Sequence, residues 1–135
     1  MLLVTRERFD YLIIDCTANI RDAITFLGMY HANRIVEVMR ASVVNYKYRL
    51  SHQIFLDDFN FGEKTLSIIN CDMGYLDVPR TEKALKIKFF CSLPYCETII
   101  EAENNGEILS AGNVRTRRDG KFIKGVNALA YELTN

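Results

Sequence analysis

The stretch HANRIVEVMRASVVNYKYRL, residues 31–50, decides the fold that the sequence predicts. Its apolar residues include Ile35, Met39 and Val43, and this spacing of about four residues places them on one face of a helix. Neither Gly nor Pro interrupts the stretch, and basic residues fill its last turn, where they suit the negative end of the helix dipole. We therefore predict one long central helix over about residues 31–49, around which the other elements pack.

Composition bounds the class of protein. The chain has 135 residues, of which 49% are hydrophobic, enough for one domain with a core of its own. Its 17 basic residues balance 17 acidic ones, so no net charge favours nucleic acid or an anionic membrane as a partner. The N-terminus MLLVTRERF lacks the layout of a cleavable signal. The four cysteines show neither CxxC nor metal-ligand spacing, so we expect free thiols, no metal site and a cytoplasmic protein.

The remaining apolar runs have the lengths of strands. FDYLIID at residues 9–15 predicts a first strand, and residues 84–93 alternate apolar side chains with lysines. Asn104-Asn105-Gly106 is a strong hairpin signal. Because the predicted helix and strands are segregated along the chain, we expect an α+β fold with a mostly antiparallel sheet. The expected strands after the helix are Thr65–Val78, Ala84–Leu93, Cys96–Glu103 and Glu107–Thr116, and the tail Phe122–Leu133 is expected as a strand or a short helix.

Two segments are similar to motifs of a known family. MYHANRIVE, residues 29–37, resembles the second half of D-x-D-x-x-G-H-V-Y-H-A-N-Y-L-x-x-x-E-x-A-R in hot-dog acyl-CoA thioesterases, and residues 97–121 resemble that family's last strands. ANRIVEVM also resembles a helix start in the malonyl-CoA-sensing domain of FapR-type lipid-synthesis repressors. Small stand-alone hot-dog proteins of the flagellar regulon in epsilonproteobacteria are a related look-alike. The resemblance implies a single hot-dog domain over residues 1–135, with an antiparallel sheet wrapped around the helix at about 31–49.

The resemblance also implies candidate residues for a site, although one residue of the family's site is missing from this sequence. In thioesterases with this motif, an Asp seven residues before the His acts as nucleophile or base, but Ile24 occupies that position here. The nearest acid is Asp22, and Glu37 is a second candidate because other hot-dog enzymes use an acid on the central helix. Arg21 falls on an arginine of the loop that precedes the helix in the FapR-type domain, which implies contact with a ligand.

Chemistry at the predicted helix start supports some of these roles. Asn33 and His31 stand where backbone N–H groups and an amide donor can polarise a thioester carbonyl. An ordinary capping role for Asn33 is the alternative. If Glu37 is buried, its pKa rises and it can act as a general base. The alternative for Glu37 is an ion pair with Arg34 or Arg40 on the same helix.

A basic cluster follows the expected hairpin. Its members are Arg115, Arg117, Arg118, Lys121 and Lys124. Such a cluster can hold the phosphates of coenzyme A through charge-assisted hydrogen bonds. The alternative is a solvated edge strand whose charges prevent aggregation. Nucleic acid is disfavoured, because few aromatic residues lie among the charges.

Two functions are consistent with this interpretation. The first is a non-catalytic acyl-CoA-binding sensor or regulator, which the missing Asp at position 24 favours. The second is an acyl-CoA thioesterase in which Asn33 and the helix N-terminus form the oxyanion site, with Glu37 or Asp22 as base. A dehydratase is weaker, since no His-plus-acid pair stands out. In either main case coenzyme A thioester is a ligand and no cofactor is expected. A homodimer or a multiple of it is expected, without nucleic acid or membrane.

Overall fold

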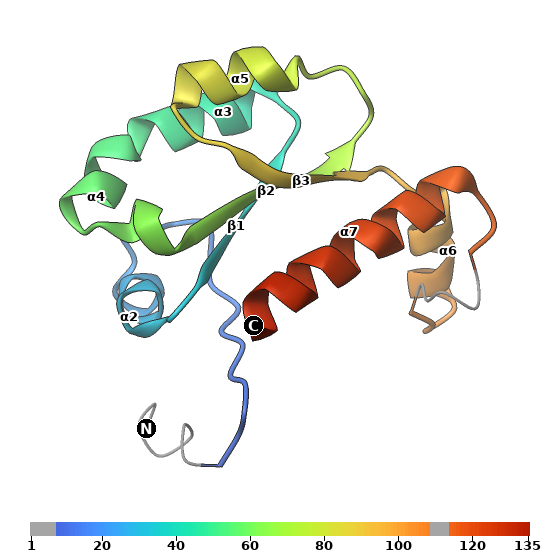
Figure 1. Cartoon of the computed structure of the whole chain (residues 1–135), viewed down its shortest axis with the longest axis horizontal. Coiled ribbons are helices and arrows are strands. Elements are labelled where there is room, and N and C mark those ends of the chain that lie inside the picture. Colours follow the sequence, from blue (N-terminus) through green and yellow to red (C-terminus); the bar gives the residue numbers. More distant parts are fainter. Residues whose placement is uncertain (1–7, 109–113) are drawn as a thin grey trace. The chain divides into compact units, whose positions relative to one another are not determined.

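The computed structural model describes residues 8–108 and 114–135 (Figure 1). By its contacts the chain divides into two compact units, residues 1–33 and residues 34–135. The three strands of the described residues belong to the second unit.

Among its described residues, from position 8 onward, the first unit contains one helix, α2, over Ala23–His31. Asp22 begins it as N-cap, because its carboxylate accepts hydrogen bonds from the backbone N–H groups of Ile24 and Thr25, both at 3.2 Å. The predicted strand at residues 9–15 is absent: this apolar run is neither helix nor strand. Its side chains are exposed, with Ile13 at 92% of its full accessible surface.

The second unit is built on a three-stranded parallel sheet. Its strands are β1 (Ile35–Arg40), β2 (Thr65–Asp72) and β3 (Phe89–Pro94), in the order β1-β2-β3. β1 and β2 pair in unbroken register from Ile35 opposite Thr65 to Arg40 opposite Asn70. The β2–β3 pairing is parallel too, with shifts of register along it. The predicted antiparallel hot-dog sheet is therefore wrong.

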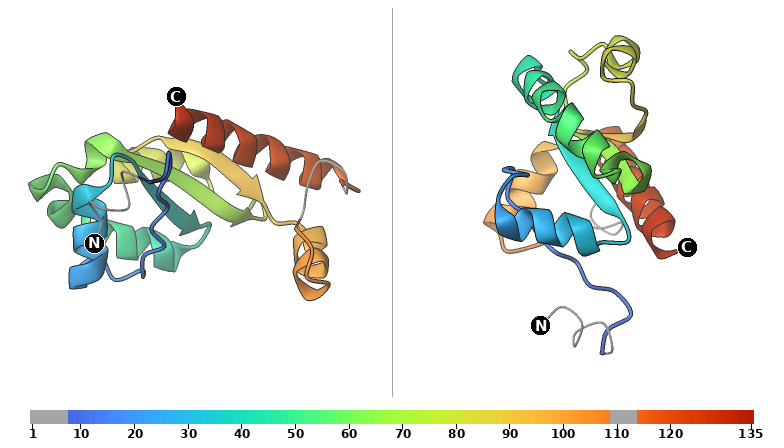
Figure 2. Two further views of the ribbon diagram at one scale, coloured as in Figure 1. Left: turned by 90° about the horizontal axis from the view of Figure 1, so that it is seen from below. Right: turned by 90° about the vertical axis from the view of Figure 1, so that its left-hand side faces the viewer.

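Helices cover both faces of this sheet. Figures 1 and 2 show α3 and α5 on one face and α7 on the other. This layering, with a helical connection between parallel strands, is that of an α/β fold. The core includes Met39, Ile68, Ile69 and Leu93 from the strands, all nearly inaccessible. The helices of this unit are α3 (Val43–Ser51), α4 (Gln53–Asp58), the 3₁₀ helix η1 (Phe61–Lys64), α5 (Val78–Leu85), α6 (Glu97–Asn104) and α7 (Arg117–Thr134).

The predicted long helix at 31–49 is wrong as well. α2 ends at His31, β1 follows over Ile35–Arg40, and α3 begins only at Val43. Branched side chains favour a strand in IVEVMR, and pairing with β2 stabilises it there. Ser42 starts the next helix, since its hydroxyl accepts the N–H of Asn45 at 3.2 Å.

Other expected strands change type. The run predicted as Cys96–Glu103 is mostly α6, and Asn104-Asn105-Gly106 ends that helix instead of forming a hairpin. Gly106 at φ +69° is typical of such an ending. β2 covers most of the strand predicted at Thr65–Val78. The second half of the strand predicted at Ala84–Leu93 belongs to β3, and its first two residues end α5. The Glu107–Thr116 strand lies partly outside the described residues, and the tail belongs to α7.

Among the described residues, no helix is both long enough and apolar enough to span a membrane.

Candidate functional site

The strands all end at the same edge of the sheet. Because they are parallel, the carboxyl ends of β1, β2 and β3 lie together, and the loops after them lead to α3, α5 and α6. In open α/β sheets, ligands bind outside this edge, where loops and helix N-termini converge. We call this place the carboxyl edge. Its strand-end residues are Arg40, Asn70, Asp72 and Pro94.

Asp72 organises the middle of the carboxyl edge. One carboxylate oxygen accepts the backbone N–H of Gly74 at 2.7 Å, and the other accepts the hydroxyl of Ser92 at 2.5 Å. Its backbone carbonyl accepts the N–H of Tyr95 at 2.9 Å. Asp72 thus ties the loop after β2 to the end of β3. Since both carboxylate oxygens already hold hydrogen bonds, Asp72 shapes this loop.

The residues beside Asp72 have an unusual backbone. Cys71 has φ +56°, a left-handed conformation that costs free energy for a residue other than glycine. Gly74, at φ +82°, completes the turn. The side-chain oxygen of Asn70 accepts the N–H of Cys71 at 2.9 Å, which fixes the Asn70 amide plane at the end of β2. The side-chain NH₂ group of Asn70 is a hydrogen-bond donor.

Two apolar side chains stand exposed in the loop between β2 and α5. Tyr75 retains 89% of its accessible surface and Met73 retains 55%. After them Asp77 caps α5, accepting the N–H of Arg80 at 3.0 Å. An exposed aromatic ring close in sequence to a fixed amide is a combination that suits a planar ligand, because the ring stacks while the amide donates.

The β1 side of the carboxyl edge carries a cation. Arg40 ends β1 with an exposed side chain, and its backbone N–H donates to Oδ1 of Asn45 at 3.5 Å. Nδ2 of Asn45 donates to the hydroxyl of Ser42 at 3.0 Å, so this pair closes the turn into α3. The carboxyl edge therefore offers a positive charge at β1 and an amide at β2.

Glu37 does not stand in this site. It lies in β1, where Nε of Arg49 comes within 2.6 Å of its Oε1 as an ion pair, without the alignment of a hydrogen bond. Its Oε2 accepts the hydroxyl of Ser67 at 2.7 Å, and Arg49 also donates to Gln53 at 2.6 Å. The Arg49 side chain is only 6% exposed. This network joins β1, β2 and α3, so Glu37 holds structure and faces no predicted tunnel.

The other candidates near the predicted helix start lie in the first unit. Asp22 caps α2, Arg21 is exposed in the preceding turn, and His31 ends the helix. Asn33 comes next, in an exposed bend. The helix that was expected to place Asn33 and Glu37 on one face does not exist, because α2 ends at His31 and Glu37 lies in β1. Asn33 is therefore at the end of a helix rather than at a helix N-terminus.

The predicted basic strand is the start of a helix. Arg117 and Arg118 are exposed in the first turn of α7, and Arg115 precedes it, 2.7 Å from a carboxylate oxygen of Glu101. The last two candidate cations, Lys121 and Lys124, also lie in α7. These cations therefore lie before and along the first half of a helix, and the predicted basic strand is wrong.

Asp119 holds the start of α7. Its carboxylate is buried and accepts the backbone N–H groups of Arg115 and Thr116, at 3.0 and 2.8 Å, and the hydroxyl of Thr98 at 3.1 Å. Burial raises the pKa of Asp119, but these hydrogen bonds outweigh it and hold the pKa below its usual range. The residue links α6 to α7 and is not available for catalysis. Burial likewise raises the pKa of the Cys96 thiol, which favours its unreactive form.

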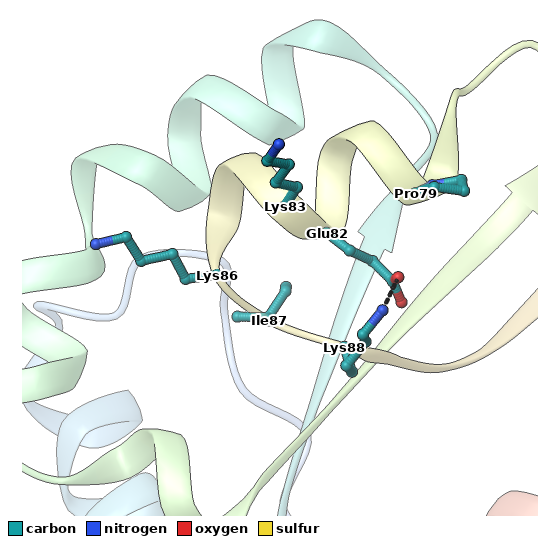
Figure 3. Close-up of a pocket in the computed structure, with 6 residues that line it drawn as sticks. All are labelled: Pro79, Glu82, Lys83, Lys86, Ile87 and Lys88. Carbon is teal, nitrogen blue, oxygen red and sulfur yellow. Dashed lines mark hydrogen bonds and ion pairs between the residues drawn. The ribbon is translucent and has the colours of Figure 1, made fainter.

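A shallow hollow lies elsewhere in this unit. It has a volume of about 340 Å³ and is lined by Pro79, Glu82, Lys83, Lys86, Ile87 and Lys88 (Figure 3). Nζ of Lys88 lies 2.7 Å from Glu82, which keeps the pKa of that carboxyl low. The hollow sits where α5 ends and β3 begins, at the opposite edge of the sheet from the carboxyl ends. By the general rule for α/β sheets it is the less favoured place for a ligand.

Sequence reasoning missed Asn70, Asp72 and Tyr75. A signal was present: IVEVM and LSII are short runs without strict alternation, typical of strands buried on both faces. The polar stretch NCDMGY comes directly after one of them, as loops at the carboxyl edge of a parallel sheet do.

Comparison with known proteins agrees with this architecture. No family model and no curated protein matches the sequence. Among solved structures, the ParA family ATPase from Chlorobium tepidum TLS is similar with a TM-score of 0.78 and 15% identity, over 95% of this chain and 54% of that one. The MinD cell division protein of Aquifex aeolicus is similar with a TM-score of 0.75 and 15% identity, over 96% of this chain and 57% of that one.

The chain thus spans little more than half the length of these two proteins. At 15% identity the likeness concerns the fold alone. It overturns the hot-dog resemblance, together with the acyl-CoA-binding and thioesterase functions that were inferred from it. The described part of this chain shares the parallel α/β fold of a ParA family ATPase and of MinD.

Proposed function

We propose that this chain binds a purine nucleotide at the carboxyl edge of its sheet, as part of an ATPase-type α/β domain. The observation that carries the proposal is the fold likeness to a ParA family ATPase over 95% of the chain. It is supported by the parallel sheet, whose carboxyl edge is the usual place for nucleotides in such folds.

The proposal assigns the base of the nucleotide to the loop after β2. Tyr75, at 89% exposure, offers a ring on which a base can stack. Asn70, whose amide plane is fixed through Cys71, donates to a ring nitrogen or carbonyl of the base. Asp72 acts as a positioning residue, because it holds the turn between Cys71 and Gly74.

This chain offers the phosphates of the nucleotide a weaker site than it offers the base. The sequence contains no G-x-x-x-x-G-K-[ST] motif, the loop whose backbone N–H groups cradle phosphates in P-loop NTPases. Arg40 at the end of β1 is the cation that this edge offers to a phosphate. The proposed activity of residues 1–135 alone is therefore nucleotide binding, with the base recognised more strongly than the phosphates.

Titration of the purified chain with adenosine, AMP, ADP and ATP, followed by calorimetry, tests the proposal. We expect binding of all four in the micromolar to millimolar range, with affinities that differ little among them. Tyr75→Ala should raise Kd by about 5- to 100-fold, the equivalent of ~1–3 kcal/mol for a stacked base.

Tyr131→Ala is the matched control. Tyr131 is also a strongly exposed tyrosine, at 71%, but it lies near the end of α7. Its substitution should leave Kd unchanged. The proposal fails if no nucleotide binds at millimolar concentration, or if both substitutions weaken binding equally.

A further inference from the structure

We infer that Ser92 of β3 is a positioning residue for the base site, by which we mean the loop after β2 with Asn70 and Tyr75. Ser92 fixes the carboxylate of Asp72 and, through that carboxylate, the turn that leads to Tyr75. The inference rests on the proposed function, because that function assigns the base to this loop. It deepens the function by naming a residue of the neighbouring strand that holds the site in its binding conformation. All of these residues belong to the second unit.

The hydrogen bond between Ser92 and Asp72 joins the ends of two neighbouring strands. The Ser92 hydroxyl donates to Oδ2 of Asp72 at 2.5 Å, between residues 20 positions apart in the chain. A hydroxyl that donates to a carboxylate at this distance forms a charge-assisted bond, which is stronger than one between neutral groups. In the sheet Ser92 lies opposite Ile69, and Asp72 lies opposite Pro94. The Asp72 side chain therefore reaches past its own partner in the register to accept this hydroxyl.

The same carboxylate fixes the turn after β2. Its second oxygen, Oδ1, accepts the backbone N–H of Gly74 at 2.7 Å. Because a carboxylate is rigid and planar, a bond that fixes Oδ2 also fixes the position of Oδ1. Without Ser92, the Asp72 side chain is free to rotate about its Cα–Cβ and Cβ–Cγ bonds, which takes Oδ1 away from Gly74. Ser92 thus acts on the turn through Asp72.

The turn needs such a bond because its backbone has an unfavourable conformation. Cys71 has φ +56°, and a residue other than glycine keeps this conformation only where surrounding contacts fix it. The side chain of Asn70 accepts the N–H of Cys71 on one side. On the other side Asp72 is held by its side-chain bonds and by the N–H of Tyr95, which donates to its carbonyl at 2.9 Å. The Ser92 bond is therefore one of a small set that holds this turn.

A turn that is held in advance favours the binding of a base. Tyr75 is 89% exposed, so its ring packs against little of the chain and its position depends on the backbone before it. A loop that is already in its binding conformation loses less conformational freedom when a ligand binds, and the affinity is higher for that reason. Ser92 is itself exposed, so replacing it removes no core packing and its effect is confined to the hydrogen bond.

Calorimetric titration of the purified chain with adenosine tests the inference. Ser92→Ala should raise Kd by about 2- to 12-fold, which corresponds to the net contribution of one hydrogen bond. Ser92→Thr keeps a hydroxyl on a residue that suits a strand, so it should restore most of the lost affinity.

A double variant separates positioning of the loop from an unrelated loss of structure. If Ser92 acts through the loop that carries Tyr75, its effect disappears once that ring is missing. Ser92→Ala added to Tyr75→Ala should therefore leave Kd as it is in Tyr75→Ala alone, whereas independent effects would add.

Amide hydrogen exchange followed by NMR spectroscopy measures the turn itself, without nucleotide. The N–H of Gly74 should exchange at least about tenfold faster in Ser92→Ala, because its acceptor is no longer held in place. Ser51→Ala is the matched control. Ser51 is also an exposed serine whose hydroxyl donates a hydrogen bond, to the carbonyl of Tyr48 at 2.7 Å, but it lies at the end of α3. Its substitution should change neither Kd nor the exchange of Gly74.

The outcomes distinguish failure of this inference from failure of the proposed function. If the wild type binds no nucleotide, both fail. If the wild type binds but Ser92→Ala leaves Kd unchanged, the inference alone fails, whether or not Gly74 exchanges faster. Additive effects in the double variant, slow exchange of Gly74 in Ser92→Ala, or no recovery in Ser92→Thr would each overturn it as well, with nucleotide binding by the wild type intact.

Discussion

At the scale of single residues, the network around Arg49 shows what a charged side chain costs inside a small domain. The guanidinium is almost inaccessible, and its charge is compensated by Glu37 across the β1–α3 contact. Gln53 and Ser67 each add a hydrogen bond to the pair. Removing one partner of such a pair is more damaging than removing both, because the other charge then stays buried without compensation.

We therefore expect Glu37→Gln to destabilise the fold by about 3–5 kcal/mol, the range for breaking a buried ion pair. Urea denaturation followed by circular dichroism measures this free energy of unfolding. In the control, Arg49→Met combined with Glu37→Gln should recover most of the loss, since no charge is left buried. If Glu37→Gln lowers the free energy of unfolding by less than about 0.5 kcal/mol, the pair behaves as a solvent-exposed ion pair and the prediction is wrong.

At the scale of elements, α7 and β3 pack more closely than ordinary side chains allow. A Cβ built on Gly125 would lie 2.5 Å from Cδ2 of Leu93, whose side chain is buried. A glycine inside a helix lowers stability by about 1 kcal/mol relative to alanine. The close approach of Leu93, which leaves no room for a Cβ, explains why glycine nevertheless occupies position 125.

Gly125→Ala should consequently lower stability by about 1–3 kcal/mol, although alanine is the better helix former. Thermal unfolding detects this as a fall in Tm. Gly120→Ala is the matched control in the same helix, because its Cβ would meet Val114 only at 4.0 Å. That variant should gain about 0.5–1 kcal/mol. Equal effects at the two positions would refute the close packing.

The elements also show how far the sequence could lead. The existence of β2 was predicted, because TLSIIN is rich in branched apolar residues. IVEVM fits a helix and a strand equally by spacing, and only its pairing with β2 decides between them. The Asn-Gly pair misled for a related reason: it ends a helix through Gly106 as readily as it turns a hairpin. The site residues were missed because their place depends on the strands being parallel.

At the scale of the whole molecule, the three strands that the structure describes lie within residues 34–135. The helices on both faces of the sheet, α3, α5 and α7, lie there as well. This unit therefore holds the elements that an α/β layer structure needs for a core.

We expect the fragment 34–135 to fold by itself. Its unfolding in urea should be a single cooperative transition, with the far-ultraviolet circular dichroism of a mixed α/β protein. A fragment of equal length, residues 1–102, lacks α7 and serves as the control, and it should show no cooperative transition. A non-cooperative profile for 34–135 would mean that residues 1–33 complete its core.

The parallel pairing of β1 and β2 has a consequence for the time at which the molecule can fold. Glu37 and its neighbour Ser67 are 30 residues apart in the chain, so no hairpin can nucleate this sheet. At about 5–20 residues per second, roughly 1.5–6 s of synthesis separates the appearance of β1 from that of β2. Throughout that interval no other strand of the described residues is available to pair with β1. Pairing of β1 with β2 therefore waits for the synthesis of β2, and the rate of synthesis limits how early this sheet can form.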